Sequence, residues 1–254
     1  MKFTHRTLAV AVAAALLVPT QATFAQGENL TEEVVVIGTR TEGRSALDSP
    51  APVDVIGGET MSNQGDTDMS NLLRNVVPSY NVNDQPISDA ATLVRPANLR
   101  GLAPDHTLML VNGKRRHRAS VITWLGNGIS NGSQGPDAAA IPALALKRIE
   151  VLRDGASAQY GSDAIAGVMN FVLNDAREGG SVEVRYGEYK EGDGEQVTIA
   201  GNIGLPLGDS GFLNLTAEWG ESDPTSRSEQ RADAQGLIDD GYQGVPVPAM
   251  IWGR

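Results

Sequence analysis

Two glycine-punctuated segments, followed at once by strands of alternating polarity, constrain the fold of this chain more than any other feature of its sequence. The first segment covers residues 99–113 and the second covers residues 148–172, and the alternating strands begin near residue 181. That order predicts a compact, turn-rich domain followed by strands of the kind that form a barrel.

The second segment predicts two strands joined by a tight connection. Residues 148–153 favour a short strand that ends at the turn dipeptide Asp154-Gly155. Residues 165–173 are almost continuously apolar, which indicates a strand buried on both faces. Gly161 and Gly167 allow a neighbouring backbone to approach closely.

The sequence of residues 148–168, RIEVLRDGASAQYGSDAIAGV, resembles the closing signature of the plug domain in TonB-dependent outer-membrane receptors. The similarity extends from residue 32 to residue 222. It implies an α+β plug domain over residues 45–176, followed over residues 177–254 by the first antiparallel strands of a transmembrane β-barrel, which is incomplete in this chain. Because barrels of the family have about 22 strands, we expect the front part of a longer protein, truncated at Arg254.

The start of the chain predicts a secretory signal peptide over residues 1–25. Lys2, His5 and Arg6 precede an apolar run over residues 8–18, and small residues before position 26 offer a cleavage site. The run is well short of the roughly twenty residues that span a bilayer as a helix. No later run is longer, which excludes a helical membrane protein. We therefore expect export, and the resemblance implies the outer membrane of a Gram-negative bacterium as the destination.

Composition excludes several functions. The formal net charge of −11 argues against nucleic acid as a partner, because phosphate binding needs a basic face. The chain has no cysteine, so it has neither a disulfide framework nor a thiolate metal site. It also lacks the H-E-x-x-H and P-loop motifs. His106 beside Asp105 is interpreted as a turn residue rather than part of a catalytic triad, so we expect no enzyme, no cofactor and no metal.

A β-prone stretch lies between the signal peptide and the plug, within residues 26–44. By β-propensity alone it favours an edge strand of the following domain. The resemblance implies a different role, a TonB box that pairs by strand addition with the periplasmic protein TonB. The residues assigned to it are Glu33, Val34, Val35, Val36, Ile37 and Gly38. The short distance from residue 25 leaves no room for an N-terminal signalling domain, which predicts transport without that function.

Local patterns predict the elements of the plug. Residues 52–56 favour a strand, and a helix follows from apolar residues at the spacing i, i+3, i+4, i+7, namely Met69, Leu72, Leu73 and Val76. Thr67 or Asp68 can cap its start. Residues 107–111 predict a strand that ends at the tight turn Asn112-Gly113. Pro142 can open a brief helix.

From residue 181 the sequence predicts about three barrel strands. Apolar residues alternate with polar ones, as in outer-membrane strands that face lipid on one side and the lumen on the other. Residues 189–195 would form an outer loop, residues 206–211 a periplasmic turn and residues 223–254 the start of a long external loop, with Trp219 in the outer aromatic girdle. By pattern alone, a soluble β-sandwich with one polar face is the alternative.

Three residues are candidates for contacts between the plug and the barrel. The resemblance implies that Arg100 and Arg153 face glutamates on the barrel wall, and Glu150 belongs to the same signature. Bidentate pairs between guanidinium and carboxylate groups would hold the plug and still release it. The alternative for both arginines is an ion pair inside the plug, for instance with Glu150.

Candidates for contact with substrate lie in loops. The basic segment over residues 114–118 predicts a solvated loop, with attraction of an anionic substrate in the barrel lumen as the alternative. The polar stretches over residues 81–89 and 126–135 are candidate plug apices. The residues chosen are Asn83, Asp84, Gln85, Arg115, Arg116 and His117.

The function implied by the resemblance is TonB-dependent import of a scarce nutrient, either an iron-siderophore or other chelate, or an oligomeric nutrient. The expected partners are TonB with its inner-membrane energising complex, outer-membrane lipid, and a substrate whose class stays open among siderophore, cobalamin, carbohydrate and peptide. The alternatives are a surface receptor or adhesin that imports nothing, and a soluble exported enzyme or binding module.

Overall fold

The structure is a computed structural model, and it describes residues 34–35, 37, 44–45, 52–66, 68–82, 94–95, 97–123, 128–225 and 232–241. All of them belong to one compact unit, residues 34–254. The predicted signal peptide lies outside the described residues. Among these residues, no helix is both long and apolar enough to cross a membrane.

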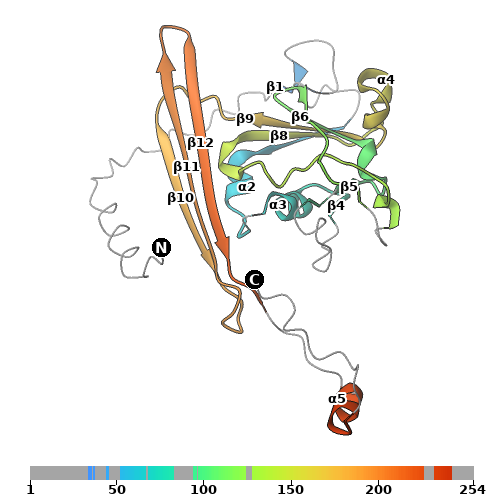
Figure 1. The fold of residues 1–254 in the computed structure, drawn as a ribbon. Coiled ribbons are helices and arrows are strands. Elements are labelled where there is room, and N and C mark those ends of the chain that lie inside the picture. Colours follow the sequence, from blue (N-terminus) through green and yellow to red (C-terminus); the bar gives the residue numbers. More distant parts are fainter. Residues whose placement is uncertain are drawn as a thin grey trace, which may run out of the picture. The chain divides into compact units, whose positions relative to one another are not determined.

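A five-stranded mixed sheet forms the centre of the first part of the chain, in the order β3-β8-β9-β6-β7 (Figure 1). Only the β6–β9 pair is parallel; the other three pairs are antiparallel. The strands are β3 (Val53–Gly57), β6 (Thr107–Val111), β7 (Lys114–Arg115), β8 (Leu146–Leu152) and β9 (Gly167–Leu173). The predicted strands over residues 52–56, 107–111, 148–153 and 165–173 are therefore confirmed, with shifts of one or two residues at some ends.

The two faces of this sheet pack in two separate clusters, because side chains alternate along each strand. On one face, Ile149, Met169 and Phe171 pack against Met61 and Leu72, which lie on helices α2 (Gly58–Ser62) and α3 (Met69–Val76). On the other face, the cluster comprises Ile37, Leu108, Leu110, Leu152, Ala164 and Val168. Burial on both sides of β9 is what its continuous apolar run predicts.

The predicted helix and turn are confirmed. Helix α3 begins after Asp68, whose carboxylate accepts hydrogen bonds from the backbone N–H groups of Ser70 and Asn71 at 2.8 and 3.2 Å. Asn112 and Gly113 both have positive φ, as the two-residue turn between β6 and β7 requires. The brief helix after Pro142 is η4 (Ala143–Ala145).

Several short elements escape the sequence patterns. They are helices α2 and α4 (Ser157–Tyr160), strand β2 (Arg44–Ser45), the paired strands β4 (Tyr80–Val82) and β5 (Ala97–Leu99), and the single 3-10 turns η2 (Pro104–His106), η3 (Gly128–Ser130) and η5 (Ser162–Ala164). Each has five residues or fewer, which is too short for a periodicity to show. Strand β1 (Val34–Val35), which pairs with β2, lies in the stretch that the sequence marks as β-prone.

Three longer antiparallel strands follow, in the order β10 (Gly180–Gly187), β11 (Gln196–Leu207) and β12 (Gly211–Ser222) (Figure 1). One face is apolar and exposed; Val182, Val184, Ile203, Leu215 and Trp219 are each at least 46% exposed. The opposite face carries half-buried or buried polar residues, among them Glu183, Arg185, Asn202 and Thr216. This alternation confirms the predicted pattern of barrel strands.

The structure refines two details of the predicted loops. The turn expected over residues 206–211 is confined to residues 208–210, because β11 extends through Leu207 and β12 already begins at Gly211. The external loop expected from residue 223 onward contains a helix, α5 (Ala232–Asp239). Residues 226–231 and 242–254 lie outside the described part of the chain.

Candidate functional site

The segment predicted to bind TonB is paired within the chain. Val34 lies opposite Ser45 and Val35 opposite Arg44 in an antiparallel pair. Ile37 is only 1% exposed and belongs to the cluster with Leu108 and Leu152. Glu33, Val36 and Gly38 lie outside the described residues. A segment that pairs as a strand here has the backbone conformation that strand addition to a partner requires.

Arg153 and Glu150, predicted to contact the barrel, have partners inside the plug. The guanidinium of Arg153 binds the carboxylate of Asp54 on β3, with Nη2 at 2.9 Å from Oδ1 and Nε at 2.5 Å from Oδ2. Glu150 is fully buried, and its carboxylate accepts hydrogen bonds from Arg148 at 2.9 Å and from Asn170 at 3.1 Å. The internal ion pair considered as the alternative thus exists for Arg153, but with Asp54 in place of Glu150.

Arg100 occupies a more open position than Arg153. Its φ is 56°, its side chain is 42% exposed, and Nη1 lies 4.0 Å from the carboxylate of Asp154 and 3.5 Å from the carbonyl oxygen of Ala166. These long contacts leave the guanidinium accessible to solvent. Contact between Arg100 and a barrel wall stays a prediction, as it does for Arg153 and Glu150.

The basic segment over residues 114–118 is more tightly bound to the plug than a solvated loop would be. Arg115 binds the carboxylate of Asp163 at 2.5 Å, and Arg118 lies 3.5 Å from the same side chain. Nε of Arg116 donates to the carbonyl oxygen of Asp137 at 2.8 Å, whereas His117 is exposed. Much of the positive charge of this segment is therefore offset by the plug itself.

Of the two stretches predicted as plug apices, the structure describes most of the second but little of the first. Asn83, Asp84 and Gln85 lie outside the described residues. In the second stretch, residues 128–135 are held against the plug, since the Ser130 hydroxyl donates to the Asn98 side chain at 3.1 Å. Whether either stretch contacts substrate stays a prediction.

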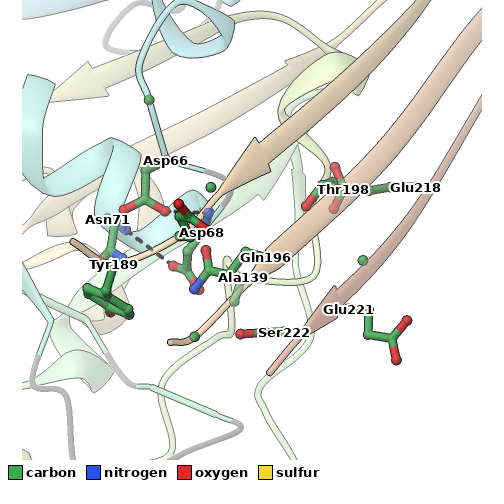
Figure 2. Close-up of a pocket in the computed structure, with 15 residues that line it drawn as sticks. Asp66, Asp68, Asn71, Ala139, Tyr189, Gln196, Thr198, Glu218, Glu221 and Ser222 are labelled. Atoms are coloured by element: carbon green, nitrogen blue, oxygen red, sulfur yellow. Dashed lines mark hydrogen bonds between the residues drawn. The ribbon is translucent and has the colours of Figure 1, made fainter. Parts of the chain in front are cut away.

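A cavity of about 660 Å³ lies between the start of α3 and the polar face of the three long strands. Figure 2 shows Asp66, Asp68 and Asn71 on one side of it and Thr198 and Glu218 on the other. The remaining lining residues are Gly65, Ala139, Gly187, Glu188, Tyr189, Gly194, Gln196, Gly220, Glu221 and Ser222. The lining contains five carboxylates and neither lysine nor arginine, so it presents chiefly hydrogen-bond acceptors and repels anions.

Metal-ligating side chains do not gather in the described part of the chain. In residues 34–241, apart from the stretches that the structure leaves undescribed, no group of three or more His, Asp or Glu is arranged to hold a metal ion. Asp66 and Asp68, two of the acidic residues at the cavity, are engaged locally: Asp66 accepts from the backbone N–H of Asp68, and Asp68 caps α3 and pairs with Arg95.

Tyr80, which is buried in the core cluster with Met69 and Leu72 of α3, provides a pH-dependent prediction. Its side chain is 4% exposed, and burial raises the pKa of the phenol above its ordinary value of about 10. The Tyr80 phenol therefore loses its proton at a lower pH in the unfolded chain than in the folded chain. The free energy of unfolding should fall as the pH rises above about 10.

Urea unfolding at about pH 8 and about pH 11 would test this. We expect Tyr80→Phe to reduce the loss of stability at the higher pH, and Tyr189→Phe, at a tyrosine 48% exposed, to leave it unchanged. An equal loss in both variants would contradict the prediction.

Comparison with known proteins identifies the plug as a separate domain. A family model described as the TonB-dependent Receptor Plug Domain matches residues 45–168. The chain is 29% identical over 213 residues to the ferrienterobactin receptor of Escherichia coli (strain K12), across 81% of this chain and 26% of that receptor. It is 28% identical over 247 residues to the vitamin B12 transporter BtuB of Photobacterium profundum, across 97% of this chain and 36% of that protein.

Solved structures give the same result. The siderophore receptor PirA from Acinetobacter baumannii matches with a TM-score of 0.51 and 26% identity over 67% of this chain and 24% of that chain. The chain belongs to the TonB-dependent receptors. It combines the plug of that family with partial barrel strands, and it spans about a quarter to a third of the length of these relatives.

Several side-chain contacts of the structure have no signal in the sequence. Asp54 and Asp163, the partners of Arg153 and Arg115, carry no local signal, because they lie 99 and 48 residues away. In the sequence, Arg185 is only one polar residue of an alternating strand, although its guanidinium reaches carbonyl oxygens more than a hundred residues away. A charged pair on the lumen side of a barrel strand is the one signal that could have singled it out.

Proposed function

We propose that this receptor takes part in TonB-dependent active import of a scarce nutrient across the outer membrane of a Gram-negative bacterium, and that it is exported by the signal peptide predicted for residues 1–25. The plug domain closes the barrel until substrate binds. TonB, driven by its inner-membrane complex, then pairs with the segment over residues 33–38 and pulls. The receptor performs no covalent chemistry, because the work of opening comes through a protein contact.

The observation that carries this proposal is the order of three parts in the described chain. A segment in strand conformation comes first, at Val34 and Val35, and a plug with its own core follows. A sheet with one apolar exposed face and one polar face comes last. A pull on the N-terminal segment can therefore be transmitted to the plug, inside a barrel whose first strands are those of the sheet.

The names of the relatives indicate a broad substrate class. One relative is named a ferrienterobactin receptor and another a vitamin B12 transporter, so a metal chelate of that size is the proposed cargo. An oligomeric nutrient remains the other class. We propose Asn83, Asp84, Gln85, Arg115, Arg116 and His117 as the plug residues nearest to it.

The test is a proline at Val35 in the complete receptor. Proline has no N–H, so Val35→Pro removes a donor that strand pairing with TonB needs. We expect energised uptake to fall to background while binding of substrate to whole cells is unchanged. Uptake of ferric enterobactin and of vitamin B12 would be measured, since these are the ligands that the names of the relatives print.

The matched control is Val35→Ala, which shortens the same side chain and keeps the N–H. We expect it to retain most of the uptake. If Val35→Pro takes up as much substrate as Val35→Ala, import does not pass through this segment and the proposal is wrong. Uptake that persists after the proton gradient is dissipated would likewise favour a receptor that does not depend on TonB.

A further inference from the structure

Arg185, on the first of the long strands, reaches across to the plug. Its Nη2 donates a hydrogen bond to the carbonyl oxygen of Ser62 at 2.8 Å, and its Nη1 donates to the carbonyl oxygen of Asp66. Its Nε binds the carboxylate of Glu183, two residues earlier on the same face of β10. The side chain is 18% exposed, so these hydrogen bonds are largely protected from solvent.

The two carbonyl groups belong to the connection between α2 and α3. Ser62 is the last residue of α2, where backbone carbonyl groups have no partner within the helix. Asp66 stands just before Asp68, which caps α3 and pairs with Arg95. Arg185 therefore fixes the connection that positions the start of α3 and one wall of the cavity in Figure 2.

Arginine suits this contact better than any other side chain. Its planar guanidinium has five N–H donors, enough to serve two carbonyl oxygens and one carboxylate together. Glu183 supplies the opposite charge and orients the guanidinium. Because the plug contributes backbone carbonyl groups only, the contact can break when the plug moves without leaving a plug side chain charged and unpaired.

We infer that Arg185 is a positioning residue that holds the plug against the first strand of the barrel wall, and that this contact must release when the plug rearranges. The inference deepens the proposed function and rests on it for the release step. It assigns to β10 the role that sequence analysis gave to Arg100 and Arg153. The Arg185 contact is defined here as the hydrogen bonds from Arg185 to Ser62 and Asp66.

A spin label on the plug would test the Arg185 contact. The chain has no cysteine, so Asn63→Cys, at an exposed residue between the two carbonyl acceptors, provides a unique attachment point in the complete receptor. We expect Arg185→Gln to raise the ratio of mobile to immobile label about tenfold, the effect of losing hydrogen bonds from a charged donor. The matched control is Lys190→Gln, which removes the same charge at an exposed position close by and should change nothing.

A second label position separates release of this connection from general loosening of the plug. Ser120→Cys is exposed and lies outside the α2–α3 connection, so its label should keep its mobility in Arg185→Gln. Arg185→Lys, which keeps the charge but cannot serve both carbonyl oxygens in the same way, should give an intermediate ratio at Asn63→Cys. It also serves as the variant to measure if Arg185→Gln fails to assemble.

Equal mobility at Asn63→Cys in Arg185→Gln and Lys190→Gln would overturn the inference. So would an equal rise at Asn63→Cys and Ser120→Cys, because that pattern indicates loss of the fold. The mobility of the label can be measured whether or not the receptor transports a substrate. If Val35→Pro leaves uptake intact while Arg185→Gln mobilises the label, the proposed function fails and the contact stands.

Discussion

Gly167→Ala is expected to destabilise the plug severely. Gly167 begins β9 with φ of 149°, a conformation that residues with a side chain rarely adopt. A Cβ at this position would lie 2.4 Å from the carbonyl oxygen of Leu152 and 2.8 Å from Cδ2 of Leu99. Backbone strain and overpacking together should lower the free energy of unfolding by about 3–6 kcal/mol, a large part of the stability of a domain this size.

Gly57→Ala is the matched control for this prediction. Gly57 also belongs to the central sheet, at the end of β3, but a Cβ there would meet nothing within 4 Å and its φ is not positive. We expect Gly57→Ala to change stability by less than about 1 kcal/mol. Urea unfolding of the two variants, followed by tryptophan fluorescence and circular dichroism, would measure the difference. Equal stabilities would mean that β8 and β9 can move apart, against the packing described here.

Glu150→Ala is expected to have the second largest effect. Glu150 lies opposite Asn170 in the β8–β9 pair, is fully buried, and accepts hydrogen bonds from both Arg148 and Asn170. Its removal takes a carboxylate acceptor away from Arg148, whose side chain is only 12% exposed. Breaking a buried pair by removing one partner costs about 3–5 kcal/mol, and we expect a loss in that range in urea unfolding.

Two variants make this prediction specific. Lys147→Ala removes the adjacent, exposed pair between Lys147 and Asp175, which has similar geometry at 2.9 Å, and should cost at most about 1 kcal/mol. The double variant Arg148→Met with Glu150→Leu replaces the buried pair by apolar groups and should recover most of the stability lost in Glu150→Ala. A double variant as unstable as Glu150→Ala would show that the carboxylate stabilises the sheet through something other than Arg148.

Elements with local causes were predictable from the sequence. Helix α3 follows from four apolar residues at helical spacing and from a cap at Asp68, all within nine residues. The turn after β6 follows from Asn112-Gly113 alone, because these two residues accept positive φ at little cost. The alternation of β10–β12 likewise requires only the period of two that every strand imposes.

Elements without such causes were not predictable. Helices α2 and α4 have five and four residues, and strands β2, β4 and β5 have two or three. Elements this short are stabilised by what they pack against, not by their own propensity. Met61 illustrates the point, because its complete burial against the central sheet is what fixes α2.

The sequence by itself determined the family resemblance, the division into plug and strands, and which charged side chains are available for ion pairs. Only the tertiary structure decided which charges meet. Arg153 could have paired with Glu150, three residues away, but the antiparallel pairing of β3 with β8 brings Asp54 to it instead. Arg185 binds carbonyl groups, which every residue has and no sequence pattern marks. Strand order and register are set by the burial of whole faces of the sheet, a long-range condition that no single segment contains.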